Sequence, residues 1–168
     1  MGVNIWRISN HRDLVGAGGL RAGGRWHSPG RAIIYCAEHP ASALLEILAH
    51  LDVANLAALP DGYQLLEINV PDAVDIESLP THALTLKWQS DDASTQAIGD
   101  RWLASRSSAL LRVPSALVPK VWNYLINPSH PAAALLKITT AVRYPFDTRL
   151  FKLVGGAKRR PAARMRRR

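Results

Sequence analysis

Alternating hydrophobic and polar positions predict several short strands along the chain. Alternation over residues 3–9 and again over residues 63–70 is typical of strands with one buried face. Short apolar runs over 32–37 and 109–113 are bounded by turn residues and indicate buried strands. Residues 123–126 form another short element. The pattern therefore predicts a sheet built from many short strands.

Two segments carry clear helical periodicity. Pro40 suits the first position of a helix, and apolar residues at helical spacing continue to about Leu51. A second helix is predicted over residues 94–105. Few long helices among many short strands indicate an α+β fold. The remaining segments are expected to be a loop over 11–24 with one helical turn around 13–15, a linker over 52–62, a short element over 75–79, an ambiguous stretch over 82–89, a rigid proline turn over 127–131, and a closing strand region over 133–140 and 142–144.

Positive charge is concentrated at the end of the chain. The 168 residues have a net charge of +8, and residues 158–168 hold seven cations and no acids. Removing these seven charges leaves +1, so the rest of the chain is nearly neutral. We expect one folded domain over 1–154 and a basic, disordered tail over 155–168. Weak contact of the tail with RNA or an acidic partner is the functional alternative.

Several classes of protein are excluded by what the sequence lacks. No apolar run is long enough to cross a membrane, and the start of the chain does not resemble a signal peptide. Cys36 is the one cysteine, which excludes an internal disulfide and fits a reducing cytoplasm. The histidines show no zinc spacing, the glycines over 16–19 form neither a Walker loop nor a dinucleotide fingerprint, and no nucleophile elbow is present. We expect a cytoplasmic protein without a metal.

The candidate chemistry begins in a glycine-rich loop. Arg25 follows Gly23 and Gly24, where the backbone can approach a ligand and a guanidinium can hold a phosphate in a fork. Trp26 and Tyr35 could stack on a ring of the same ligand. The alternatives are a surface arginine and two aromatic residues of the core. Together these residues favour a phosphorylated ligand that carries a ring.

Two polar residues stand in apolar surroundings further along the chain. Glu46 lies among apolar helix residues, where a carboxylate is costly to bury unless it is paired or used. Alternatively, it faces solvent between two apolar stripes. Ser115 follows a predicted strand and the rigid Pro114, so its hydroxyl either binds a ligand or caps a turn.

The order of these motifs resembles that of the RES-domain toxins, which are named for an Arg, a Glu and a Ser. The resemblance spans roughly residues 5–151 and implies an ADP-ribosyltransferase-like fold of the diphtheria-toxin type, with a mixed β-sheet core and short flanking helices. It also implies that NAD+ is consumed and that an Xre-type antitoxin is the partner. The matching motifs are Trp6-Arg7, Gly23-Gly24-Arg25-Trp26, Tyr35, Ala43-Leu44-Leu45-Glu46, Val113-Pro114-Ser115, Asn127-Pro128-Ser129-His130-Pro131 and Phe146-Asp147-Thr148-Arg149-Leu150.

The resemblance implies a role for each of these residues. Arg25, Glu46 and Ser115 are the expected catalytic trio, and Tyr35 is expected in the nicotinamide pocket. The residues expected to bind NAD+ are Arg7, Arg25, Trp26, Tyr35 and Ser115. His27 stands where many members are expected to have Asn, and it is given no role.

The sequence leaves three functions open. The first is a toxin that cleaves the nicotinamide–ribose bond of NAD+, with water or phosphate accepting ADP-ribose and Glu46 stabilising the cationic transition state. The second is transfer of ADP-ribose to a specific host protein. The third is a non-enzymatic module that binds nucleic acid or protein through its tail. For the toxin, a helix-turn-helix antitoxin of the Xre type is expected to cover the active site.

Overall fold

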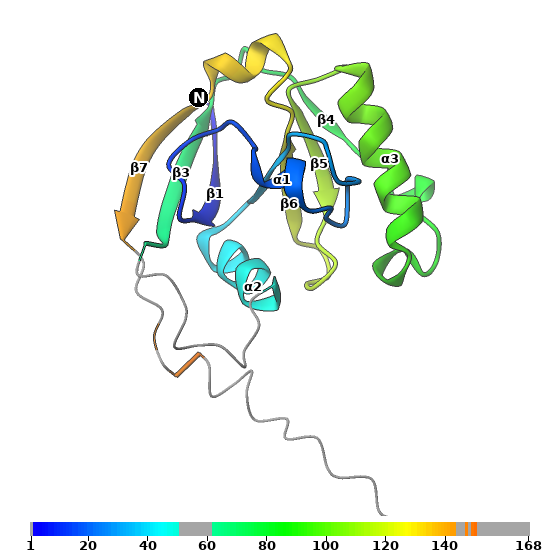
Figure 1. The fold of residues 1–168 in the computed structure, drawn as a ribbon, viewed down its shortest axis with the longest axis horizontal. Helices are drawn as coiled ribbons and strands as arrows, with labels where there is room; N and C mark the ends of the chain where they lie inside the picture. The colour runs from blue at the N-terminus through cyan, green and yellow to red at the C-terminus, as the bar shows by residue number, and fades with distance from the viewer. Residues whose placement is uncertain (1, 51–61, 144–146, 148, 151–168) are drawn as a thin grey trace, which may run out of the picture.

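The computed structural model describes residues 2–50, 62–143, 147, 149 and 150. Predictions for the linker over 52–61, for the segment 144–146 and for the basic tail lie outside these residues. Within them the chain forms a seven-stranded mixed sheet flanked by short helices (Figure 1). The α+β prediction is therefore confirmed.

The strands form the sheet in the order β4-β5-β6-β2-β1-β3-β7. Neighbouring strands are antiparallel except for β4 and β5, which are parallel. In Figure 1, α3 lies beyond the β4–β5 side of the sheet and α2 lies below β1. The bounds are β1 Val3–Ser9, α1 Gly18–Arg21, β2 Ile34–Ala37, α2 Pro40–His50, β3 Gln64–Val70, β4 Ile76–Ser78, η2 Thr81–Ala83, η3 Trp88–Ser90, α3 Asp92–Ser105, β5 Leu110–Pro114, β6 Trp122–Ile126, η4 Pro131–Leu135 and β7 Lys137–Arg143.

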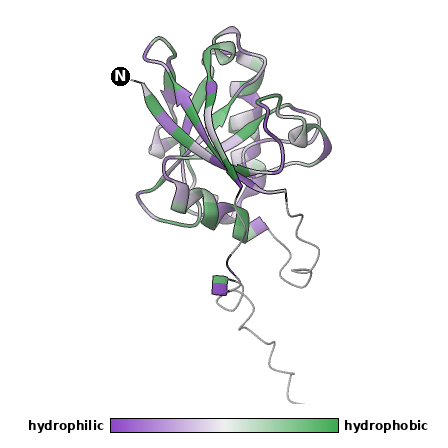
Figure 2. Ribbon diagram, turned by 90° about the vertical axis from the view of Figure 1, so that its left-hand side faces the viewer, coloured by the Kyte–Doolittle hydropathy of each residue, from purple (hydrophilic) through white to green (hydrophobic). Residues whose placement is uncertain are grey.

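Successive side chains of a strand point to opposite faces of the sheet, and apolar side chains are buried on both faces. Figure 2 shows hydrophobic residues along the strands. One face packs Ile34, Leu110 and Ile126 into an apolar cluster. The other face packs Leu111 and Leu125 against further apolar residues, which include side chains of α3 and the glycine-rich loop. Both halves of the sheet are therefore held by a packed core, and the loop is part of that core.

The sheet is joined across its middle by a single residue pair. β1 pairs with β3 along its whole length, from Val3–Val70 to Ser9–Gln64. Between β1 and β2, in contrast, the register contains only the pair Trp6–Ala37. The two strands therefore part beyond this junction, and the gap that opens there is the site of the pocket described below.

Helix α2 is fixed over this junction by its own sequence. Ala43 is buried against Ile8 of β1 and Ala37 of β2, and its small side chain lets the helix approach the sheet closely. Pro40 is the first helical residue, as predicted, and the His39 ring accepts a hydrogen bond from an N–H of the first turn. The packing of α2 on the sheet therefore fixes the directions in which its other side chains project.

Several element boundaries differ from the sequence-based expectation; β2, for example, begins at Ile34 rather than at residue 32. The helical turn of the first loop lies at Gly18–Arg21 rather than at 13–15. Helix α3 begins at Asp92, two residues early, because the Asp91 side chain accepts the Ser94 N–H and caps it. The expected strand over 133–140 begins only at Lys137, because Pro131–Leu135 forms a 3₁₀ turn.

Candidate active site

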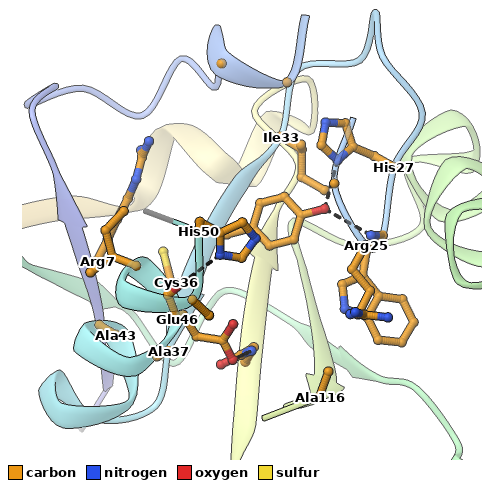
Figure 3. Close-up of a pocket in the computed structure, with 18 of the residues that line it drawn as sticks. Arg7, Arg25, His27, Ile33, Cys36, Ala37, Ala43, Glu46, His50 and Ala116 are labelled. Atoms are coloured by element: carbon orange, nitrogen blue, oxygen red, sulfur yellow. Dashed lines mark hydrogen bonds between the residues drawn. The ribbon is translucent and has the colours of Figure 1, made fainter. Parts of the chain in front are cut away.

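A pocket of about 750 Å³ lies where β1 and β2 part. Its walls come from both strands, α2, the glycine-rich loop, the first turns of α3 and the segment after β5. Its volume is in the range of pockets that bury a ligand of nucleotide size. Figure 3 shows side chains of this pocket, with Arg7, Arg25 and Glu46 projecting from three different elements.

Glu46 of α2 is held by two hydrogen-bond donors. Its Oε1 atom accepts the Ser115 hydroxyl at 3.0 Å and the Asn123 Nδ2 group at 2.7 Å. These donors compensate a half-buried carboxylate, which is otherwise costly to remove from water. Both donors bind the Oε1 atom, and Oε2 makes no hydrogen bond to another described residue. Glu46 therefore presents a positioned carboxylate to the pocket.

Ser115 both caps a turn and orients Glu46. Its hydroxyl oxygen accepts the backbone N–H groups of Leu117 and Val118, each at 3.2 Å. With these donors on the oxygen, the hydroxyl proton is directed to Glu46. The two roles left open by the sequence are thus combined, and the serine acts on the pocket through the carboxylate.

Asn123 is a site residue that the sequence analysis missed. It is buried on β6 opposite Ala37, at the junction of the two half-sheets. Because a carboxylate only accepts hydrogen bonds, the amide nitrogen must face Glu46. In the sequence Asn123 is one polar residue within a short strand, and only the pairing of β2 with β6 brings it to α2.

The loop that carries Arg25, residues 23–31, is anchored by one face of α3. The spacing of Asp92, Gln96 and Asp100 places them on the same side of the helix. Gln96 donates to the Gly24 carbonyl at 2.9 Å, and Asp100 accepts the Ser28 N–H at 3.0 Å. A stripe of polar residues therefore holds the loop against the helix.

Arg25 itself lies at the mouth of the pocket. Its Nη1 atom contacts Asp92 Oδ1 at 3.0 Å, and 30% of its side chain is exposed. The other guanidinium nitrogens make no hydrogen bond to described residues. Arg7 of β1 also lines the pocket, is half-buried, and forms no hydrogen bond or ion pair with another described residue. Two cationic side chains are therefore available to an anionic ligand.

Trp26 is a buried core residue that also lines the pocket. Its side chain is 2% exposed and packs at a tilt against Trp88, with the ring centroids 5.9 Å apart. Its backbone N–H donates to the Tyr35 hydroxyl at 3.1 Å. The sequence allows Trp26 to be either a ligand-stacking residue or a core residue. Its burial favours the core role, in which Trp26 supports the wall of the pocket.

His27, for which the sequence predicts no role, holds the side chain of Tyr35 in place. The His27 Nε2 atom faces the Ala22 carbonyl at 3.0 Å, so Nε2 carries the proton. Burial lowers the pKa of His27, which keeps the ring neutral and leaves Nδ1 as the acceptor of the Tyr35 hydroxyl proton at 2.8 Å. Burial also raises the pKa of Tyr35 above its usual value. Tyr35 therefore offers a ligand its ring rather than its hydroxyl.

Two negative findings concern the described residues alone. They contain no group of three or more His, Cys, Asp or Glu side chains that could hold a metal ion. None of their helices is long and apolar enough to cross a membrane.

The chain is similar to proteins of a known family. The RES domain model matches residues 4–147. The chain is 44% identical over 147 residues to a protein called Toxin Res from Pseudomonas putida, covering 88% of this chain and 99% of the relative. It is 38% identical over 162 residues to the Prs ADP-ribosylating toxin of Sphingobium sp., covering 90% and 99%.

A solved structure shares the fold. It is that of the M. tuberculosis MbcT-MbcA toxin-antitoxin complex, which matches with a TM-score of 0.63 at 20% identity and covers 93% of this chain and 90% of the matched chain. The family match extends over most of the chain and includes all the pocket residues named above. The chain belongs to the RES-domain family of toxins.

Proposed function

We propose that this RES-domain toxin consumes NAD+ by cleaving the bond between nicotinamide and ribose. The observation that carries the proposal is the positioned carboxylate of Glu46, which shares a pocket with two cations, Arg7 and Arg25. NAD+ has a matching distribution of charge, with an anionic diphosphate and a ribose carbon that becomes cationic as the bond breaks.

Each pocket group has a task in this reaction. Arg25 and Arg7 hold the diphosphate, since guanidinium groups form forked, charge-assisted hydrogen bonds with phosphate. The ring of Tyr35 packs on nicotinamide. Glu46 stabilises the oxocarbenium-like ribose, and Ser115 and Asn123 keep its carboxylate in one orientation.

Two acceptors of ADP-ribose are considered within this proposal. One is a small nucleophile, water or phosphate, and the other is a side chain of a host protein. The name of the Sphingobium relative, an ADP-ribosylating toxin, supports the second, and the volume of the pocket is compatible with either.

Incubation of the purified toxin with NAD+, with and without cell lysate, separates these acceptors. Free ADP-ribose, or its phosphate ester, formed without lysate indicates hydrolysis or phosphorolysis. A labelled protein band that requires lysate indicates transfer. If neither product forms and NAD+ is unchanged, the proposal is wrong.

We also propose that a helix-turn-helix antitoxin of the Xre type covers the pocket in the bacterial cytoplasm. The match to a toxin from a toxin-antitoxin complex supports a partner of this kind. A stable neutralising interface should bury more than about 1,000 Å² in total. Occlusion predicts that the purified complex consumes NAD+ far more slowly than the free toxin, and equal rates would contradict it.

Replacing Arg25 with alanine is expected to weaken NAD+ binding by about tenfold, because the lost guanidinium contacts the diphosphate before the reaction as well as during it. The measurement is the NAD+ affinity by calorimetry together with the rate of nicotinamide release. The matched control is Arg101→Ala, which removes an exposed arginine of α3 outside the pocket. Unchanged affinity in Arg25→Ala would remove Arg25 from the diphosphate site.

A further inference from the structure

We propose that His50 is the catalytic residue that takes the proton from the attacking nucleophile. This assignment rests on the proposed cleavage of NAD+ and adds the step that follows it. His50 is the last residue of α2 and lines the same pocket as Glu46, one helical turn away. In the view of Figure 3 its ring lies between Arg7 and Arg25.

The other titratable groups that line the pocket are already engaged. His27 uses both ring nitrogens, one on Tyr35 and one on the Ala22 carbonyl. The Tyr35 hydroxyl donates to His27 and accepts from the backbone. Cys36 is buried, and Asp92 pairs with Arg25. The His27 ring therefore has no free nitrogen, and the Tyr35 hydroxyl is held between two partners. The Cys36 thiol is buried, and the Asp92 carboxylate is paired with a cation.

Glu46 is also unsuited to this task within the proposed mechanism. It must stay ionised to stabilise the positive ribose, and its Oε1 atom already accepts two hydrogen bonds. A separate base lets the carboxylate keep its charge while the nucleophile loses a proton. Glu46 can therefore stabilise the cation while His50, on the same helix, accepts the proton.

The tautomer of His50 follows from a single contact. Its Nδ1 atom lies 2.7 Å from the backbone carbonyl of Glu46, which can only accept a hydrogen bond. Nδ1 therefore carries the proton, and in the neutral ring the lone pair is on Nε2. The same contact links the orientation of the imidazole to the helix that positions Glu46.

Attack of water on the ribose releases one proton, which His50 accepts. The oxygen of a water molecule forms a bond to C1′ of the ribose while the C1′–N bond breaks and nicotinamide leaves as a neutral molecule with the electron pair. The proton of the water passes to Nε2 of His50 and then to solvent. The same transfer would serve the hydroxyl of a protein side chain.

The test is the His50→Asn variant in phosphate-free buffer, with nicotinamide release as the measurement. The asparagine amide can still donate to the Glu46 carbonyl, but it cannot take a proton. We expect kcat to fall about 10²-fold with little change in KM. The matched control is His82→Asn, which replaces an exposed histidine outside the pocket.

Rescue of the variant by azide distinguishes a general base from a residue with only a structural role. Azide is an anion that attacks C1′ without losing a proton, so it should restore nicotinamide release in His50→Asn by about tenfold or more and leave the wild type nearly unaffected. A variant as fast as the wild type, or a slow variant that azide does not accelerate, would overturn the assignment of His50. If the wild type releases no nicotinamide with water, with phosphate or with cell lysate, the proposed function fails, and so does the assignment of His50.

Discussion

Replacing Glu46 with glutamine is expected to slow nicotinamide release by about 10³-fold, the largest loss of activity that we predict. Glutamine keeps the size of the side chain, and its carbonyl oxygen can still accept from Ser115 and Asn123. What is lost is the negative charge opposite the developing ribose cation. Because that charge matters mainly in the transition state, NAD+ affinity should change far less than kcat.

The control for this variant is Glu67→Gln. Glu67 lies on β3 outside the pocket, and its carboxylate also accepts hydrogen bonds from two side chains, those of Asn4 and Thr140. Loss of charge there should leave turnover unchanged. A folded Glu46→Gln protein with normal turnover would show that Glu46 has no part in the chemistry.

Replacing Gly99 with alanine is expected to cost about 2 kcal/mol or more of folding stability. A Cβ atom at this position of α3 would lie 1.8 Å from the backbone oxygen of Trp26, so the helix and the loop would have to separate. The gain in helix propensity, about 1 kcal/mol, is too small to offset this overlap. A melting temperature lower by roughly 5 °C is the expected measurement.

Gly18→Ala is the matched control for stability, because a Cβ atom on Gly18 of α1 would meet nothing within 4 Å. Separation of α3 from the loop should also displace Arg25, so Gly99→Ala is expected to bind NAD+ more weakly even where it is folded. A variant with unchanged melting temperature would show that the loop can move away without loss.

The parts of this fold that could be predicted from sequence are those that local rules determine. The strand over 3–9 and the helix that begins at Pro40 follow from hydrophobic periodicity and from the fixed φ of proline. The strand order could not be predicted, because it depends on pairing between distant segments, such as β2 with β6. The late start of β7 follows from a proline-led turn whose apolar residues resemble a strand.

The candidate site shows the same division. Arg25, Glu46 and Ser115 are candidates because each is a polar residue in unusual local surroundings, but only the family resemblance names them as a trio; Glu46 and Ser115 are joined by a hydrogen bond in the structure. Asn123 and His27 gave no local signal, since their roles depend on contacts made by the folded chain. The role of the polar face of α3 could not be predicted either, because the loop that it holds is distant along the chain.

The single pair between β1 and β2 has a consequence for how this pocket responds to mutagenesis. Beyond Trp6 and Ala37, the facing edges of the two strands border the pocket instead of each other. Strand edges carry peptide N–H and C=O groups, which every side-chain replacement other than proline preserves. An alanine scan would therefore detect the charged residues of the pocket and leave any contribution of this backbone invisible.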